Sequence, residues 1–251
     1  YPAVYSNINY SYDFFVENKQ LHTLGGISNV QTVNCNEGGQ YQIYKSDRYG
    51  FNNPDEIHDN DKLQVGIVGD SYMQGSCVKR EYTLGSFISD KFPRTLVIAS
   101  AGNGSLSNLA SLVEYLSDKE PEVVLWFFTA GNDLIEQSDE RKSFSIFNKY
   151  LEEENFKQDL KLYQKEIDKH LIAIAERENP ENLKSKAREI VLFFAFEQLL
   201  SELTAIIFKI VKKYSPDVSN EIIQVNPQYE REYLIKVLLK AKEIVEKWSG
   251  N

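Results

Sequence analysis

The stretch Leu63–Gly75, LQVGIVGDSYMQG, decides how the rest of the chain is interpreted. Its first half is apolar and rich in β-branched residues, the polar sequence DNDK precedes it, and Gly-Asp-Ser ends it. This pattern predicts a buried strand with Ser71 directly after its carboxyl end. Because ligands bind at the carboxyl ends of the strands in an open α/β sheet, Ser71 is placed where a nucleophile would be useful.

Strand and helix patterns alternate from this point to residue 134. Two further apolar strands are expected at Thr95–Ala99 and Glu122–Phe128, and helices at 82–92 and 106–117. The last of these strands is apolar on both faces, which is typical of a central strand in a parallel sheet. Strands that alternate with helices form right-handed βαβ units, so the sequence predicts an α/β fold with a parallel sheet.

The chain is expected to form a single domain. Residues 1–62 are rich in Tyr, Asn, Asp and Gly, and we interpret them as a loop-rich lead-in whose aromatic side chains pack onto the core at 63–134. A long helical region follows at 143–248, with segments at 151–178, 183–213 and 229–248. The apolar run 190–211 is too wide for one face of a surface helix, which favours a buried helix over a subunit or membrane-surface contact.

The composition argues against several classes of protein. The net charge of −9 disfavours nucleic-acid binding, which needs a concentrated basic face. No apolar run is long enough for a transmembrane helix, and the first residues lack the pattern of a signal peptide. The two cysteines, Cys35 and Cys77, are interpreted either as one bridge, which would indicate an oxidising compartment, or as two buried thiols.

Three polar loops follow the three expected strands, and in a parallel sheet these loops lie at one edge. They carry Ser71, Gly102 and Asn132. Acyl transfer needs a hydroxyl nucleophile and hydrogen-bond donors aimed at the oxyanion that develops during attack. Ser71 is the candidate nucleophile, and the candidate donors are the backbone N–H groups of Ser71 and Gly102 and the side-chain amide of Asn132. No cofactor and no metal ion is expected.

Each of these residues also has a purely structural interpretation. Serine is favoured as a helix N-cap, which would explain Ser71 without any chemistry. Gly102 suits a turn with positive φ. Asn132 and Asp133 suit a turn or the start of a helix, and for Asp133 we prefer this interpretation. The co-location of the three loops favours catalysis for Ser71.

The same motifs resemble those of the SGNH, or GDSL-type, hydrolase family. In that comparison Ser71 lies in the Gly-Asp-Ser block, Gly102 is the glycine after the second strand, and Asn132 lies in the Gly-Asn-Asp block after the third. The resemblance covers residues 63–134 and implies a three-layer, doubly wound parallel sheet of flavodoxin-like topology. The sequence DRYGFNNPD at 47–55 is similar to the lead-in of members from bacterial surface-polysaccharide loci, which implies an acylated carbohydrate substrate and a periplasmic or envelope location.

The family's fourth motif, an Asp-x-x-His pair that supplies the general base, has no counterpart late in this sequence. Of the three histidines, His58 has the right spacing but precedes the first strand, His170 lies in a helical pattern, and His22 belongs to the lead-in. We therefore interpret the chain as a fragment that lacks its last strand and its base. Without an imidazole Ser71 is a weak nucleophile, and very low esterase activity is predicted.

The preferred function is ester hydrolysis by a serine enzyme, or O-acyl transfer, on the O-acyl groups of carbohydrates. The alternative is a non-catalytic member of the same fold, a binding or assembly module that uses the helical region 143–248. A flavodoxin-like nucleotide-binding protein is disfavoured, because GDSYMQG lacks the Gly-rich pattern with a lysine that cradles phosphate.

Overall fold

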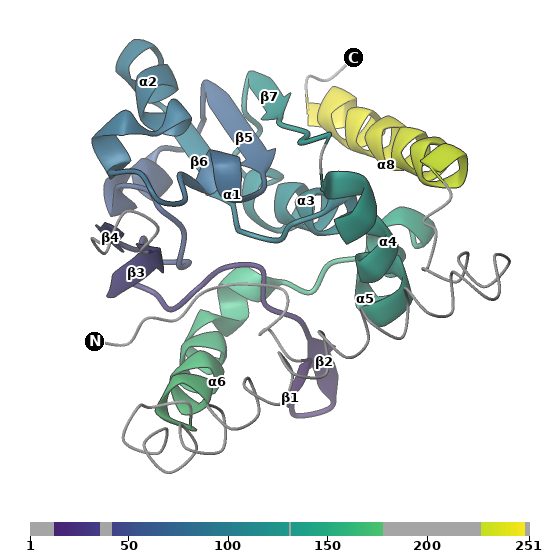
Figure 1. Cartoon of the computed structure of the whole chain (residues 1–251), viewed down its shortest axis with the longest axis horizontal. Helices are drawn as coiled ribbons and strands as arrows, with labels where there is room; N and C mark the ends of the chain where they lie inside the picture. Colours follow the sequence, from purple (N-terminus) through teal and green to yellow (C-terminus); the bar gives the residue numbers. More distant parts are fainter. Residues whose placement is uncertain (1–12, 36–41, 131, 178–226, 249–251) are drawn as a thin grey trace, which may run out of the picture. The chain divides into compact units, whose positions relative to one another are not determined.

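A computed structural model describes residues 13–35, 42–130, 132–177 and 227–248 (Figure 1). Within this part of the chain the fold is mixed α/β, with seven α-helices and a three-stranded parallel sheet. The described residues up to Ala173 and from Pro227 onward belong to one compact unit, and all contacts reported below lie within it. The helix expected at 183–213, with its apolar run 190–211, lies outside the described residues.

The parallel sheet consists of β5 (Val65–Gly69), β6 (Thr95–Ala99) and β7 (Val123–Trp126) in the order β6-β5-β7. All three predicted strands are confirmed, and β5 pairs with both neighbours in parallel register. Among the described strands β5 is the central one, and β7 pairs with β5 alone. An apolar pattern does not report how many strands flank a strand, and in β7 Val123 is exposed and the other residues are half-buried.

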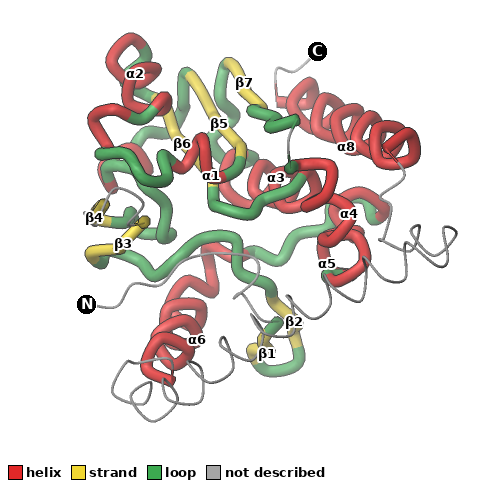
Figure 2. Tube along the Cα trace, viewed as in Figure 1, coloured by secondary structure: helices red, strands yellow, loops and turns green. Residues whose placement is uncertain are grey.

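The helical elements of the described chain begin at Asp55, after the strands β1 to β4 of the lead-in (Figure 2). The α-helices are α1 (Ser71–Gln74), α2 (Leu84–Lys91), α3 (Ser105–Ser111), α4 (Asp133–Ser143), α5 (Ser145–Glu152), α6 (Gln164–Arg177) and α8 (Pro227–Trp248). Shorter turns are η1 (Asp55–Asp59), η2 (Arg80–Tyr82), η3 (Leu112–Leu116) and η4 (Leu160–Tyr163). None of the described helices combines the length and the apolar character that a membrane span needs.

Helices cover both faces of the sheet. Successive side chains of a strand point to opposite faces. On one face Ile67 and Val97 belong to a buried cluster with Met73 of α1, and Ile88 of α2 packs against it. On the other face the backbone of Gly66 lies against the Leu116 side chain of η3, so close that a Cβ at this position would lie 2.8 Å from it. Both faces of β5 are therefore buried, which accounts for its unbroken apolar pattern.

The helix predicted at 151–178 is interrupted. Helix α5 ends at Glu152, and helical structure resumes at η4 and α6. The carboxylate of Glu114, buried in η3, accepts hydrogen bonds from the backbone N–H groups of Gln158 and Leu160 and from the Tyr150 hydroxyl. These bonds hold the intervening segment in a non-helical path. Helix α8 confirms the helix expected at 229–248 and begins at Pro227, because proline fits the first turn of a helix.

The lead-in is more regular than its composition indicates. It contains two antiparallel hairpins, β1 (Phe14–Val16) with β2 (Lys19–Leu21) and β3 (Gln31–Cys35) with β4 (Gln42–Lys45). As expected, it buries aromatic side chains on the core, and the ring of Phe51 packs edge-to-face on Tyr115 at 4.9 Å.

Asp47 organises the turn that follows the second hairpin. This fully buried carboxylate accepts hydrogen bonds from the backbone N–H groups of Tyr49 and Phe51 and from the side chains of Asn53 and His58. A buried carboxylate with four donors is well satisfied. The sequence DRYGFNNPD therefore has a structural reason to begin with an aspartate.

Asn53 closes one edge of the sheet. Its side-chain amide donates to the carbonyl oxygen of Val97 at 2.8 Å and accepts from the N–H of Val97 at 3.0 Å. Val97 lies at the middle of β6, an edge strand of the described sheet. One side chain thus makes the two hydrogen bonds that a neighbouring strand would make there.

Cys77 forms a disulfide bond, and no described cysteine is free. The only other cysteine of the sequence is Cys35. Of the two interpretations of Cys77, the bridge is therefore confirmed and the buried thiol is wrong. Cys77 follows α1 and has a positive φ of 65°.

Candidate functional site

The three strand-end loops come together at the carboxyl edge of the sheet. The loop after β6 touches the end of β5, because the Asn103 side-chain amide lies 3.5 Å from the carbonyl oxygen of Gly69. It also reaches α1, where the N–H of Ala101 donates to the Gln74 side chain at 3.1 Å. The loop after β7 meets the end of β5 through the carboxylates of Asp70 and Asp133. The expected convergence of these loops therefore holds.

Ser71 is the first residue of α1 and does not act as its N-cap. The N-cap is Asp70, whose carboxylate oxygen Oδ1 accepts from the N–H of Tyr72 at 3.0 Å. The structural interpretation of Ser71 as a capping residue is therefore wrong, because its neighbour performs that role. Ser71 is partly exposed, and its hydroxyl makes no hydrogen bond within the described part of the chain.

Gly102 has a φ of 80°, in the left-handed region that side chains with a Cβ rarely adopt. The turn interpretation of this residue is thus satisfied, and Gly102 is also partly exposed beside the buried Asn103. Gly102 has no side chain of its own to cover its backbone amide.

Asn132 lies at the N-cap position of α4, but its side chain does not cap the helix. Its amide nitrogen Nδ2 instead donates to Oε1 of Glu136, one turn further along α4, at 3.0 Å. The expected oxyanion donor is therefore held by a carboxylate in this structure. Asp133, for which a capping role was preferred, begins α4 and accepts from the N–H of Thr129 at 2.8 Å.

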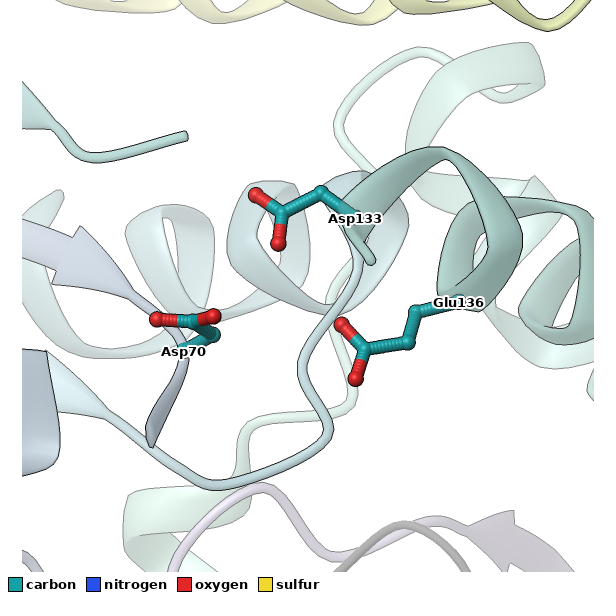
Figure 3. A group of neighbouring side chains, drawn as sticks. All are labelled: Asp70, Asp133 and Glu136. Atoms are coloured by element: carbon teal, nitrogen blue, oxygen red, sulfur yellow. The ribbon is translucent and has the colours of Figure 1, made fainter. Parts of the chain in front are cut away.

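Three carboxylates gather at the meeting point of the loops from β5 and β7 (Figure 3). One oxygen each from Asp70, Asp133 and Glu136 lies within 4.8 Å of the other two. Figure 3 shows all three carboxyl groups turned toward a common space between the end of β5 and the start of α4. Asp70 and Asp133 are each 1% exposed.

Burial opposes the charged forms of two of these acids, Asp133 and Glu136. Burial raises the pKa of Asp133 to about 7, and the nearby Asp70 and Glu136 charges add to the effect. The pKa of Glu136 is also raised by burial, against the lowering effect of its bond from Asn132. The sequence reasoning missed Glu136 and the meeting of these acids. The spacing of Asp133 and Glu136, three residues apart on a helix, was a signal for it.

A fourth carboxylate, Glu140, links α4 to the loop after β6 and to the start of α3. It is 1% exposed and accepts from the backbone N–H groups of Gly104, Leu106 and Ser107 at the start of α3, and from the Ser107 hydroxyl. The first turn of α3 has no cap of its own. Glu140 therefore caps α3 from the neighbouring helix and holds α4 against the loop that carries Gly102.

The three histidines are engaged in contacts away from Ser71. His22 is fully buried, pairs with Asp13 at 2.7 Å and packs edge-on against Phe144 and Phe147. The pairing holds the pKa of Asp13 below its usual value. His58 is bound by Asp47 in the turn described above. His170, in α6, stacks on Phe14 with ring centroids 4.4 Å apart, which agrees with the packing role expected for it.

Comparison of the chain with models of protein families, with curated proteins and with solved structures finds no match.

Proposed function

We propose that the chain is a serine esterase or O-acyltransferase of the SGNH type that acts on the O-acyl groups of carbohydrates. The observation that carries this proposal is the convergence of three loops at the carboxyl ends of β6, β5 and β7, with Gly102, Ser71 and Asn132 in turn. A parallel sheet brings loops together at this edge, where α/β proteins bind their ligands.

The strand order supports the finer topology that the resemblance implies. In chain order the strands β5, β6 and β7 are first, second and third, so the arrangement β6-β5-β7 is second-first-third. This order begins the flavodoxin-like, doubly wound sheet, in which ligands bind between the first and third strands. Helices on both faces of the sheet agree with a three-layer architecture.

In the proposed reaction Ser71 Oγ attacks the carbonyl carbon of an acyl ester. The new bond from Oγ to carbon forms, the bond from carbon to the sugar oxygen breaks, and the sugar hydroxyl leaves with a proton. Water or a second sugar hydroxyl then attacks the same carbon, the bond from carbon to Oγ breaks, and the proton of the acceptor returns to Ser71 Oγ. The Ser71 hydroxyl makes no hydrogen bond among the described residues, because Asp70 caps α1 in its place, and this supports a role as nucleophile. Because the described imidazoles are engaged elsewhere, we expect slow turnover.

Labelling of the full chain with an aryl fluorophosphonate tests the proposal. Attack by Ser71 forms an oxygen–phosphorus bond and releases fluoride, so the intact mass rises by one phosphonyl group. Ser76→Ala is the matched control, because Ser76 lies on the same segment and outside the proposed site. We expect the parent and Ser76→Ala to be labelled at equal rates, and Ser71→Ala to react at least tenfold more slowly. Equal labelling of Ser71→Ala would overturn the proposal.

The second candidate is a non-catalytic binding or assembly module. One observation favours it: Ile235, Leu238 and Leu239 of α8 are each at least 40% exposed and lie at helical spacing. Large apolar side chains gathered in this way are typical of contact surfaces. If Ser71→Ala leaves both phosphonylation and p-nitrophenyl acetate hydrolysis unchanged, this candidate replaces the enzyme.

A further inference from the structure

The carboxylates of Asp70, Asp133 and Glu136 share one feature that capping and loop packing leave unexplained. Each uses one oxygen to accept a hydrogen bond, from the N–H of Tyr72, the N–H of Thr129 and the Asn132 amide respectively. Each keeps its other oxygen buried and without a donor among the described residues. One oxygen therefore fixes the orientation of each carboxylate, and the second is left available.

Keeping three neighbouring carboxylates ionised in a buried site costs free energy unless a positive charge lies beside them. Asp70 and Asp133 are almost completely buried, and in the part of the chain that the structure describes no Lys or Arg forms an ion pair with them or with Glu136. Buried carboxylates in proteins are protonated, paired with a cation or bound to a metal ion. Fixed first oxygens and unpartnered second oxygens are the arrangement in which outer hydrogen bonds orient the ligands of a metal ion.

We propose that Asp70, Asp133 and Glu136 bind a hard divalent cation, with Ca²⁺ preferred over Mg²⁺. Ca²⁺ binds carboxylate oxygens at about 2.3–2.6 Å, so opposite ligands lie about 4.6–5.2 Å apart. Oxygens within 4.8 Å of one another fit that sphere. Mg²⁺ demands near-ideal octahedral geometry at about 2.1 Å and is usually held by one or two carboxylates, so a group of three carboxylates favours Ca²⁺.

Neutral oxygens on the loops after β6 and β7 are candidates to complete the coordination. The side-chain carbonyl oxygens of Asn103 and Asn132 are buried and have no donor among the described residues. Amide carbonyls are ordinary ligands of hard cations. The site goes beyond the ester chemistry proposed above, since it needs the three carboxylates and does not need the Ser71 hydroxyl.

Calorimetric titration of the EDTA-treated full chain with CaCl₂, and separately with MgCl₂, tests the site. We expect one Ca²⁺ to bind and to saturate below about 1 mM, and Mg²⁺ to bind more weakly. Asp133→Asn and Glu136→Gln should each weaken Ca²⁺ binding at least tenfold. Asp139→Asn is the matched control, because Asp139 is an exposed acid on the same helix, and it should bind Ca²⁺ within twofold of the parent.

Thermal unfolding separates loss of the ion from loss of the fold. At 100 times its dissociation constant, Ca²⁺ should raise the midpoint of the parent and of Asp139→Asn by about 5–10 °C. In EDTA, Asp133→Asn should unfold no lower than the parent, because burial disfavours the charged form of the acid that it removes. At the same Ca²⁺ concentration, its midpoint should rise by at most about half as much as that of the parent, because its affinity is at least tenfold weaker. Ser71→Ala should bind Ca²⁺ as the parent does, whatever its reactivity toward fluorophosphonate.

Two results would overturn the cation site. One is the absence of a binding heat and of a thermal shift with 5 mM of either ion, which would mean that protons alone balance the cluster. The other is an equal loss of Ca²⁺ affinity in Asp139→Asn, which would mean that the ion binds to surface charge. Neither result bears on the nucleophile, which the labelling experiment tests separately.

Discussion

Replacing Glu140 by Gln tests the balance of forces at the contact between α3 and α4. The carboxylate accepts from three backbone N–H groups and one hydroxyl, which favours its charged form, but it is buried, which favours its neutral form. Burial dominates and raises the pKa of Glu140 from 4.5 to about 7. The native state therefore binds this proton more tightly than the unfolded state does.

Because the pKa of Glu140 is higher in the native state than in the unfolded state, the contribution of this residue to the stability of the protein falls as the pH rises. The contribution of Glu140 is fully present below about pH 4.5 and is lost as the pH rises to 7. A shift of two to three pKa units corresponds to about 3 kcal/mol of unfolding free energy. Glu140→Gln does not titrate, so the stability difference between parent and variant should fall by about 3 kcal/mol between pH 4.5 and 8.

Urea unfolding followed by the fluorescence of Trp126 and Trp248, in EDTA and at several pH values, measures this difference. Groups such as Asp133 titrate in both proteins and cancel in the comparison. Asp139→Asn, exposed on the same helix, should differ from the parent by less than about 0.5 kcal/mol at every pH. A difference that stays flat, or that grows as the pH rises, would mean that the four donors dominate over burial and would refute the reasoning.

Two further predictions concern the lead-in. Asn53→Ala should lower the free energy of unfolding by about 2–4 kcal/mol, because it leaves the buried N–H and C=O of Val97 without partners. The control, Asn60→Ala, should lower it by less than about 1 kcal/mol. Equal urea midpoints for the two variants would contradict this prediction. Gly50→Ala should strongly lower the midpoint of thermal unfolding, because φ at this position is 87° and a Cβ would lie 2.2 Å from the backbone of Gly26. A midpoint within about 2 °C of the parent would contradict this prediction.

The strands of the sheet are predictable from the sequence because the pattern that identifies each strand lies within the strand and in the residues next to it. An apolar run bounded by polar residues and followed by a glycine loop identifies β5, β6 and β7, and β6 has the predicted bounds. The neighbours of β7 are not a local property, and among the described strands β5 takes the central position. The break after α5 is equally non-local, because Glu114 in η3 supplies the hydrogen bonds that hold the chain there.

For the candidate site, the sequence indicates which loops meet and does not indicate how their side chains pair. Convergence of the loops that carry Ser71, Gly102 and Asn132 follows from parallel strands alone. Two adjacent residue types favoured as N-caps, Asp70 and Ser71, compete for one role, and the three-dimensional structure assigns it to Asp70. The bond from Asn132 to Glu136 likewise depends on where α4 begins, which the sequence leaves open by several residues.

The Asn53 amide also determines how the sheet can grow. Edge strands present open backbone groups that recruit further strands, including strands of other molecules. The middle of β6 is blocked, since its outward N–H and C=O at Val97 are already bound. A fourth strand, whether it comes from elsewhere in this chain or from another molecule, therefore has β7 as its docking edge. In the described sheet β7 is thus the edge strand next to β5, and the loops after these two strands carry the three carboxylates.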